Sequence, residues 1–203
     1  MPLTTFEEEI YLRTLTGRMV GKAAADLGVK KLAVVAPKNI ICSSIATATE
    51  ASFLDYTGGV TYHFMVEPGK NEEDVVARLK EFKPQATLLQ FGGETPIETI
   101  KESFVKTLKE MAAKEVPGDI IVHVRIFAAG GLAKALEDES VKKYLAGRTV
   151  LVYTVDFDRG KVIVNKVDVE GEIKLTPVVE YHVTLEHADL LNRSLKDRKV
   201  VFQ

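Results

Sequence analysis

The sequence contains no tryptophan and only one cysteine among its 203 residues. Because Cys42 is the only cysteine in the chain, no intrachain disulfide can form. Cysteine content therefore does not indicate whether the protein works in an oxidising or a reducing compartment. No apolar run approaches the roughly 18 residues that a membrane-spanning helix needs. The N-terminal stretch 1–9 is acidic and lacks the apolar segment of a secretory signal. We therefore expect a soluble, cytoplasmic protein without a membrane partner.

The chain also lacks an excess of charge of either sign. Its 27 basic and 29 acidic residues leave a net charge of −2, so no overall field attracts nucleic-acid phosphates or anionic lipid. Glutamine and asparagine are scarce as well. Few thermolabile amides beside abundant Lys, Glu and Val are typical of thermophilic organisms. These absences disfavour a nucleic-acid partner and predict a thermophilic source.

The composition that remains is that of an ordinary globular domain. Hydrophobic residues account for 46% of the chain and charged residues for 28%. A chain of this length buries roughly 70% of its unfolded surface, so it needs neither a disulfide nor a metal to fold. The sequence shows no internal repeat and no linker-like stretch. We expect residues 1–203 to form one domain.

Short apolar runs alternate with amphipathic segments between residues 30 and 147. The alternation predicts βαβ units, a mainly parallel sheet and helices on both of its faces, in a three-layer arrangement of the Rossmann or flavodoxin-like kind. The segment 131–146 is expected to form one helix or two, because Asp138 can restart it. The predicted strands are 31–36, 60–66, 86–91 and 119–127, and the other predicted helices are 43–53, 72–82 and 97–114.

The two ends of the chain follow different patterns. Residues 1–28 are predicted to form a helix in which Gly17 and Gly21 lie on one face and allow another backbone to approach. After Gly147 the sequence becomes rich in strand-forming residues, and it ends in a short predicted helix, 187–195. We therefore expect residues 148–203 to form an antiparallel extension of the sheet.

Three predicted loops carry small or hydroxylated residues directly after a strand. In open parallel sheets ligands bind at the carboxyl ends of the strands, where helix N-termini present unpaired N–H groups. Glycine pairs let a ligand approach the backbone, although such a pair is also the usual composition of a tight connection. We expect a small molecule with a phosphate or carboxylate group to bind there, with no cofactor assigned. The loop residues assigned to this ligand are Ser43, Ser44, Gly92, Gly93, Thr95, Gly130 and Gly131.

Four further side chains are candidates for chemistry at the same edge. Glu94, His123 or Cys42 would be the acid, base or nucleophile of an enzyme, with Arg125 steadying negative charge. Cys42 should precede a helix, which lowers a thiol pKa, but a lone cysteine is also commonly a small buried hydrophobe. His123 and Arg125 share one face of the predicted strand 119–127. That face either lines a cavity or belongs to an edge strand, and the edge is the favoured interpretation.

Two resemblances to known families accompany these patterns. The stretch Lys31–Lys101 resembles the nucleotide-binding half of iron-dependent alcohol dehydrogenases and dehydroquinate synthases, in which a strand leads into a glycine-rich turn and an acid-rich helix. Here Gly92-Gly93-Glu94 stands where three glycines and a serine are expected, and the metal-binding helical domain of those enzymes is lacking. No activity is carried over.

Asp156 together with Glu172-Ile173-Lys174 is similar to the acid and E-x-K arrangement of PD-(D/E)xK nucleases. In those enzymes two carboxylates and a lysine hold a divalent metal and activate water. Solvated acids in turns are the ordinary explanation of such a cluster, and no metal ligands are assigned. Three functions thus stand in order: binding of a small anion, a non-catalytic homo-oligomeric assembly module, and a metal-dependent nuclease.

Overall fold

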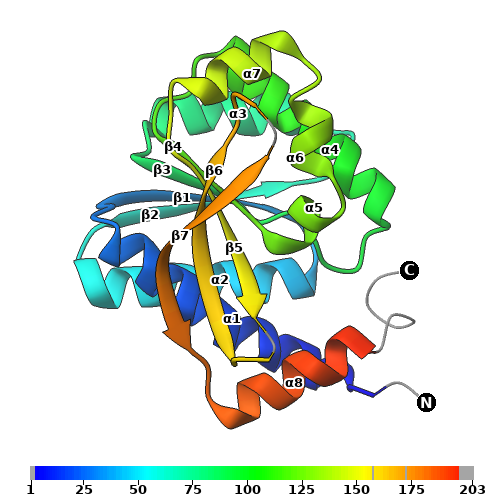
Figure 1. Ribbon diagram of the computed structural model, residues 1–203. Coiled ribbons are helices and arrows are strands. Elements are labelled where there is room, and N and C mark those ends of the chain that lie inside the picture. Colours follow the sequence, from blue (N-terminus) through cyan, green and yellow to red (C-terminus); the bar gives the residue numbers. More distant parts are fainter. Residues whose placement is uncertain (1–2, 157, 172, 197–203) are drawn as a thin grey trace.

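The computed structural model describes residues 3–156, 158–171 and 173–196. One sheet runs through the molecule in the strand order β2-β1-β3-β4-β5-β6-β7 (Figure 1). The pairs among β1 to β5 are parallel, whereas β6 pairs antiparallel with β5 and with β7. The predicted α/β class, with its C-terminal antiparallel extension, is confirmed. The strands are β1 (Lys31–Pro37), β2 (Val60–Val66), β3 (Ala86–Leu89), β4 (Asp119–Val122), β5 (Val150–Asp156), β6 (Lys161–Asp168) and β7 (Lys174–His182).

Helices cover both faces of the sheet (Figure 1). On one face, side chains of α3, α4, α6 and α7 form a large apolar cluster with the strands. On the other face α1 and α2 form a second cluster, and α8 packs against α1 through Leu12, Leu190 and Leu191. The helices are α1 (Phe6–Asp26), α2 (Ile40–Thr57), α3 (Glu72–Phe82), α4 (Ile97–Ala113), α5 (Val124–Ala128), α6 (Gly131–Ala135), α7 (Glu139–Ala146) and α8 (Leu185–Lys196).

The interior strand β1 is apolar from Leu32 to Pro37, and its place in the sheet explains this run. Ala33 and Val35 belong to one cluster, and Leu32 and Val34 belong to the other. All four side chains are fully buried, because a parallel strand covered on both faces has no side facing water.

Gly17 and Gly21 allow the backbones of α1 and α2 to approach closely. A Cβ atom at Gly17 would lie 2.5 Å from the carbonyl oxygen of Ile45, and one at Gly21 would overlap the carbonyl oxygen of Thr49. The predicted packing role of the glycine pair is confirmed. This close contact fixes α1 against α2.

The structure corrects the prediction for residues 119–127. The strand ends at Val122, and residues 124–128 form the short helix α5. His123 caps this helix, because its Nδ1 accepts a hydrogen bond from the backbone N–H of Arg125 at 3.1 Å. Since β4 lies between β3 and β5, it is not an edge strand, and the favoured interpretation of His123 and Arg125 was wrong. An apolar, β-branched run alone does not reveal a side-chain cap of this kind.

Other boundaries differ by a few residues. The segment 131–146 forms two helices, and Asp138 caps the second through the N–H of Ser140. The helix α2 begins at Ile40, earlier than predicted, because the Asn39 side chain accepts the N–H of Cys42 at 2.8 Å. The last helix, α8, begins at Leu185, two residues before the predicted start at residue 187. Among the described helices, none combines the length and apolar character of a membrane span.

Candidate functional site

A cavity of about 600 Å³ lies at the carboxyl ends of β3, β4 and β5, enclosed by α1, α2 and α8. It occupies the sheet edge where ligands bind in folds of this type. The lining combines side chains from the N-terminal helix, the middle of the chain and the C-terminal helix. The lining residues are Leu12, Arg13, Thr16, Ile41, Cys42, Ile45, Gln90, Gly92, Gly93, His123, Val124, Arg125, Ala128, Tyr153, Thr154, Val155, Leu191 and Ser194.

Much of the cavity wall is apolar. Leu12 and Leu191 come from the packed pair α1 and α8, and Ile41 and Ile45 come from α2. Leu12, Ile41 and Ile45 are at most 2% exposed. A wall of this kind stabilises the apolar body of a ligand by removing it from water.

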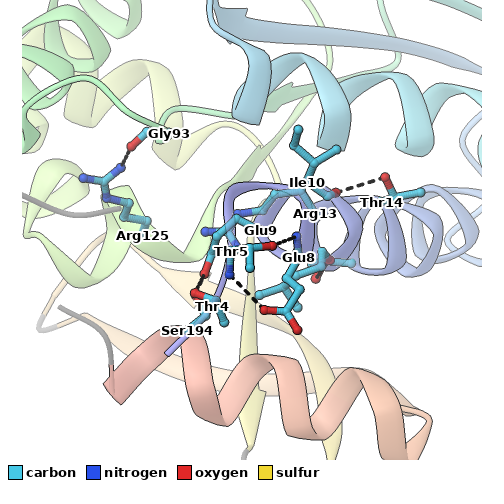
Figure 2. Close-up of polar contacts among 12 residues, drawn as sticks. Thr4, Thr5, Glu8, Glu9, Ile10, Arg13, Thr14, Gly93, Arg125 and Ser194 are labelled. Atoms are coloured by element: carbon cyan, nitrogen blue, oxygen red, sulfur yellow. Dashed lines mark hydrogen bonds and ion pairs between the residues drawn. The ribbon is translucent and has the colours of Figure 1, made fainter. Parts of the chain in front are cut away.

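Arg125 brings a positive charge into this apolar surrounding. Its Nη1 donates a hydrogen bond to the carbonyl oxygen of Gly93, which joins the loops after β3 and β4 (Figure 2). Burial lowers the pKa of Arg125 to about 10, and the nearby Arg13 acts in the same direction. The guanidinium therefore remains charged at neutral pH, but in a site where its charge is poorly solvated. A bound anion stabilises a poorly solvated guanidinium more than it stabilises one exposed to water.

Arg13 supplies a second guanidinium from α1. Its side chain is 12% exposed, and its Nη1 lies 3.1 Å from Oε2 of Glu9 (Figure 2). Burial lowers the pKa of Arg13, while the Glu9 carboxylate opposes this shift. Among the described residues that line the cavity, two are arginines and none is acidic. The lining thus favours a negatively charged guest.

His123 is held neutral at the base of the same cavity. Burial, and then the charges of Arg13 and Arg125, lower its pKa to about 3, although the carbonyl group of Phe91 opposes the shift. Because Nδ1 accepts the N–H of Arg125, the ring proton of the neutral imidazole belongs on Nε2. The ring also packs edge-on against Tyr153, with centroids 5.3 Å apart. His123 thus positions Arg125 through its Nδ1.

Cys42 is buried in the wall, with 1% of its surface exposed. Burial raises the pKa of its thiol to about 11, despite the opposing effects of Asn39, Gly92 and the two arginines. The lowering of the thiol pKa that we expected from a helix N-terminus is therefore outweighed by desolvation. At neutral pH Cys42 is a small, protonated side chain.

A buried polar pair completes the lining. Tyr153 and Gln90 are at most 1% exposed, and the tyrosine hydroxyl lies 3.1 Å from Nε2 and 3.2 Å from Oε1 of the amide. Because an amide and a hydroxyl each donate and accept, this pair is able to bind a hydrogen-bond donor or a hydrogen-bond acceptor of a ligand.

The structure brings together five of the residues predicted for the site, namely Cys42, Gly92, Gly93, His123 and Arg125. Ser43 and Ser44 instead line a shallow depression at the start of α2. Glu94 is exposed and Thr95 is half-buried, and neither lines the cavity. Gly130 borders a charged groove between α4 and α6, and Gly131 packs against Ile126. The insertion of α5 after β4 carries this last glycine pair away from the cavity.

Sequence reasoning missed six polar residues of the lining, namely Arg13, Thr16, Gln90, Tyr153, Thr154 and Ser194. Arg13 follows a core leucine on α1, and Gln90 interrupts an apolar run, so each was a visible polar residue in an apolar segment. Tyr153 and Ser194 carried no such signal, because only the packing of β5 and α8 brings them to the cavity.

Glu172, the first residue of the predicted E-x-K arrangement, lies outside the residues that the structure describes. Asp156 accepts the N–H of Arg159 at 3.0 Å in the turn after β5. Within the described part of the chain, no group of three His, Cys, Asp or Glu side chains is placed to hold a metal ion.

Comparison with known proteins shows what the fold is similar to. A solute-binding protein of an ABC transporter from Rhodopseudomonas palustris BisB5, in complex with 3,4-dihydroxybenzoic acid, matches with a TM-score of 0.56 and 13% identity over 86% of this chain and 66% of that chain. Another from R. palustris, in complex with benzoate, matches with a TM-score of 0.53 and 12% identity over 84% of this chain and 65% of that chain. At these identities the likeness shows the fold alone.

Two matches rest on sequence. A protein of Aquifex aeolicus (strain VF5), described as an uncharacterized protein, is 31% identical over 80 residues, which are 39% of this chain and 37% of that protein. The chain therefore spans little more than a third of this relative and just under two thirds of the solute-binding chains. A family model described as "Uncharacterized protein" matches residues 9–190, and the chain belongs to that family.

Proposed function

We propose that this protein binds a small organic acid, with an apolar body and a carboxylate group, in the cavity between α1, α2 and α8. The carboxylate is held by Arg125 and Arg13, and the apolar body lies against the leucine and isoleucine side chains of the wall. The single observation that carries this proposal is the lining itself, in which two arginines face a largely apolar cavity of about 600 Å³. A volume of this order suits a ligand of drug or metabolite size.

The geometry of the carboxyl edge supports an anion at the arginine side. Gly93 has φ +81°, and a Cβ atom there would lie 2.5 Å from Oδ1 of Asn39 and 2.8 Å from Sγ of Cys42. Only glycine fits this turn, which holds its carbonyl group against the Arg125 guanidinium. Arg125 is thus oriented before a ligand arrives, and preorganisation of this kind raises affinity.

The ionisation of the cavity groups favours binding over proton transfer. A general acid or base works best with a pKa near the working pH. The pKa of Cys42 is raised to about 11 and that of His123 is lowered to about 3, so neither group changes its protonation state near neutral pH. Benzoate and 3,4-dihydroxybenzoic acid, the molecules bound to the two solute-binding proteins of similar fold, are of the ligand class we propose.

Calorimetric titration with benzoate and with benzyl alcohol tests the proposal. The alcohol keeps the ring but has no charge, so we expect benzoate alone to bind measurably. Arg125→Gln should weaken benzoate binding roughly 10- to 100-fold, the loss of one charge-assisted hydrogen bond. The matched control is Arg18→Gln, an exposed residue of α1 outside the lining, which should bind benzoate as the wild type does. Equal binding of alcohol and acid, or binding of neither, contradicts the proposal.

A further inference from the structure

The two edge strands of the sheet, β2 and β7, differ in composition (Figure 1). β7 carries Lys174, Pro177 and Glu180, and a register shift interrupts its pairing with β6. Charges, proline and irregular pairing are the features by which edge strands avoid pairing with another chain. The seven residues of β2 include no Lys, Arg, Asp, Glu, Pro or Gly. β2 thus has the composition of a strand that pairs on both sides.

The backbone of β2 directs part of its hydrogen-bonding groups away from the sheet. Val60 donates its N–H to the carbonyl oxygen of Lys30, so it faces β1. In a parallel pair, residues that bond to the neighbouring strand alternate with residues whose N–H and C=O point the other way. The N–H and C=O groups of Thr61, His63 and Met65 therefore lie along the free edge.

One of these groups already has a partner in the same chain. The carbonyl oxygen of Met65 accepts a hydrogen bond from Nδ2 of Asn71 at 3.3 Å. For Thr61 and His63, the structure of the described residues places no backbone group of another strand against the edge. The free pairing capacity of the edge is therefore centred on Tyr62, the residue between them.

The exposed side chains along this edge are largely apolar. Val60, Tyr62 and Met65 are each at least 44% exposed, and Leu54 of the adjoining helix α2 is 42% exposed. Thr47, one helical face with Leu54, is exposed as well. A contact that covers these side chains removes apolar surface from water, and such surfaces mark interaction sites.

The charged side chains that flank the middle of β2 are of opposite sign. Glu50 of α2 accepts a hydrogen bond from Thr61 Oγ1 at 3.4 Å, on one face of the sheet. On the other face, the exposed Arg78 of α3 donates one to the Tyr62 hydroxyl at 2.8 Å. Burial raises the pKa of Glu50 to about 7, and solvent screens the charge of Arg78. A second copy of this edge therefore meets no row of like charges.

We propose that β2 pairs antiparallel with β2 of a second copy of this chain, about a two-fold axis at Tyr62. In this register Thr61 of one copy lies opposite His63 of the other, and the two residues exchange N–H···O bonds on both sides of the axis. All free groups of these two residues are then paired, and one sheet runs through both copies. Because the same surface serves in both copies, assembly closes at a dimer. β2 does not line the cavity, so this inference is independent of the proposed function.

Sedimentation velocity of the full chain tests the dimer. The N–H of Thr61 points away from β1, so Thr61→Pro removes a donor of the interface without breaking a bond within the sheet. We expect the wild type to be dimeric at about 100 μM, and Thr61→Pro to raise the dimer Kd roughly tenfold or more. Thr61→Ala is the matched control, because it shortens the side chain but keeps the backbone N–H, and it should remain dimeric.

Crosslinking tests the register. Residues opposite one another in a non-hydrogen-bonded antiparallel pair have Cα atoms about 4.5 Å apart, which a disulfide can bridge. Oxidised Tyr62→Cys should therefore form a covalent dimer, while the native Cys42 is buried and does not contribute. The control is Val178→Cys on β7, where the native side chain is 49% exposed, and it should stay monomeric on a denaturing gel.

Each outcome decides for or against the β2 dimer. A wild type that is monomeric at about 100 μM overturns it and leaves the edge to an extended segment of another protein. A dimer that Thr61→Pro leaves intact, or equal crosslinking of Tyr62→Cys and Val178→Cys, also overturns it. Should Thr61→Pro fail to fold, the crosslinking comparison decides alone. Benzoate titration reports separately on the proposed function, because folded Thr61→Pro keeps the whole cavity lining.

Discussion

Among the residues that the structure describes, Glu9 and Glu72 are completely buried glutamates, one on each face of the sheet. Their surroundings differ in a way that bears on function. Glu72, at the start of α3, accepts hydrogen bonds from the Gly69 N–H at 2.5 Å, from Ser103 Oγ at 2.7 Å and from Lys106 Nζ at 3.1 Å. Glu9, at the start of α1, is bonded to Thr4, Ser194 and Arg13. Both carboxylates are thus equally well paired.

The difference lies in what the cationic partner touches. Lys106 extends from α4 to the protein surface, where its side chain is 49% exposed and borders the charged groove between α4 and α6. Arg13 instead has a cavity on its other side. A buried ion pair is therefore not a sign of function by itself. The pair becomes part of a candidate site where one member also lines a largely apolar cavity, as Arg13 does. The comparison predicts that the two glutamates affect different properties.

The largest expected effect is on stability at Glu72. Glu72→Ala removes the acceptor of three donors and one partner of a buried ion pair, so we expect the free energy of unfolding to fall by about 3–5 kcal/mol. Benzoate affinity of the folded variant should stay at the wild-type value, because Glu72 and the cavity lie on opposite faces of the sheet. Urea denaturation and calorimetry measure the two quantities. A loss of affinity beyond about twofold would break the comparison.

The next effect combines stability with affinity. Gly21→Ala places a methyl group against the Thr49 carbonyl oxygen, and the resulting shift of α1 should cost about 1–3 kcal/mol of unfolding free energy. Because α1 carries Arg13, we also expect benzoate affinity to fall several-fold. Gly147→Ala is the control, since its nearest atom is 4.0 Å away, and it should change stability by less than about 0.5 kcal/mol. Unchanged affinity in Gly21→Ala would show that the α1 wall contributes nothing to binding.

A smaller effect is expected on the pH dependence of stability, to which the buried Glu72 carboxylate contributes. Burial raises the pKa of Glu72, but the Gly69 N–H, Ser103 and Lys106 together outweigh it, so that the net pKa lies below the ordinary value of 4.5. A lowered carboxylate pKa stabilises the fold above the unfolded pKa and loses this contribution as the pH falls through the folded pKa. The wild type should therefore lose stability below about pH 4.5. In Glu72→Gln this acid-induced loss should be smaller, as urea titrations at several pH values will show, and an identical loss contradicts the assignment.

The sequence predicted the parts of the fold that depend on local patterns. The bounds of α3 and β2 match the predicted ranges 72–82 and 60–66, because each segment carries its own apolar period and its own turn residues. The strand 119–127 was predicted too long, since the turn into α5 depends on a hydrogen bond between His123 and the next residues, which periodicity does not contain. The predictions of a cytoplasmic location, a thermophilic source and a homo-oligomer stay predictions.

The site was predicted less well, for a physical reason. Loop glycines mark the carboxyl edge of the sheet, and Gly92 and Gly93 do line the cavity. The wall opposite them is built by α1 and α8, which are almost the whole chain apart in sequence and meet through three leucines. No local sequence pattern indicates that Arg13 and Ser194 line the same cavity. Residues contributed by such distant segments are visible only after the chain has packed.

Alkylation of Cys42 tests whether the cavity is a binding site or a reactive one. With a pKa of about 11, roughly one thiol in a thousand is ionised at about pH 8, against about a quarter for an ordinary cysteine. We expect alkylation of native Cys42 to be at least about 100-fold slower than in the urea-unfolded chain, and benzoate to slow it further, because the thiol lines the cavity. The rate is measured by mass spectrometry, and phenol serves as the uncharged control ligand. Alkylation as fast as in the unfolded chain would contradict the buried, neutral thiol and restore Cys42 as a candidate nucleophile.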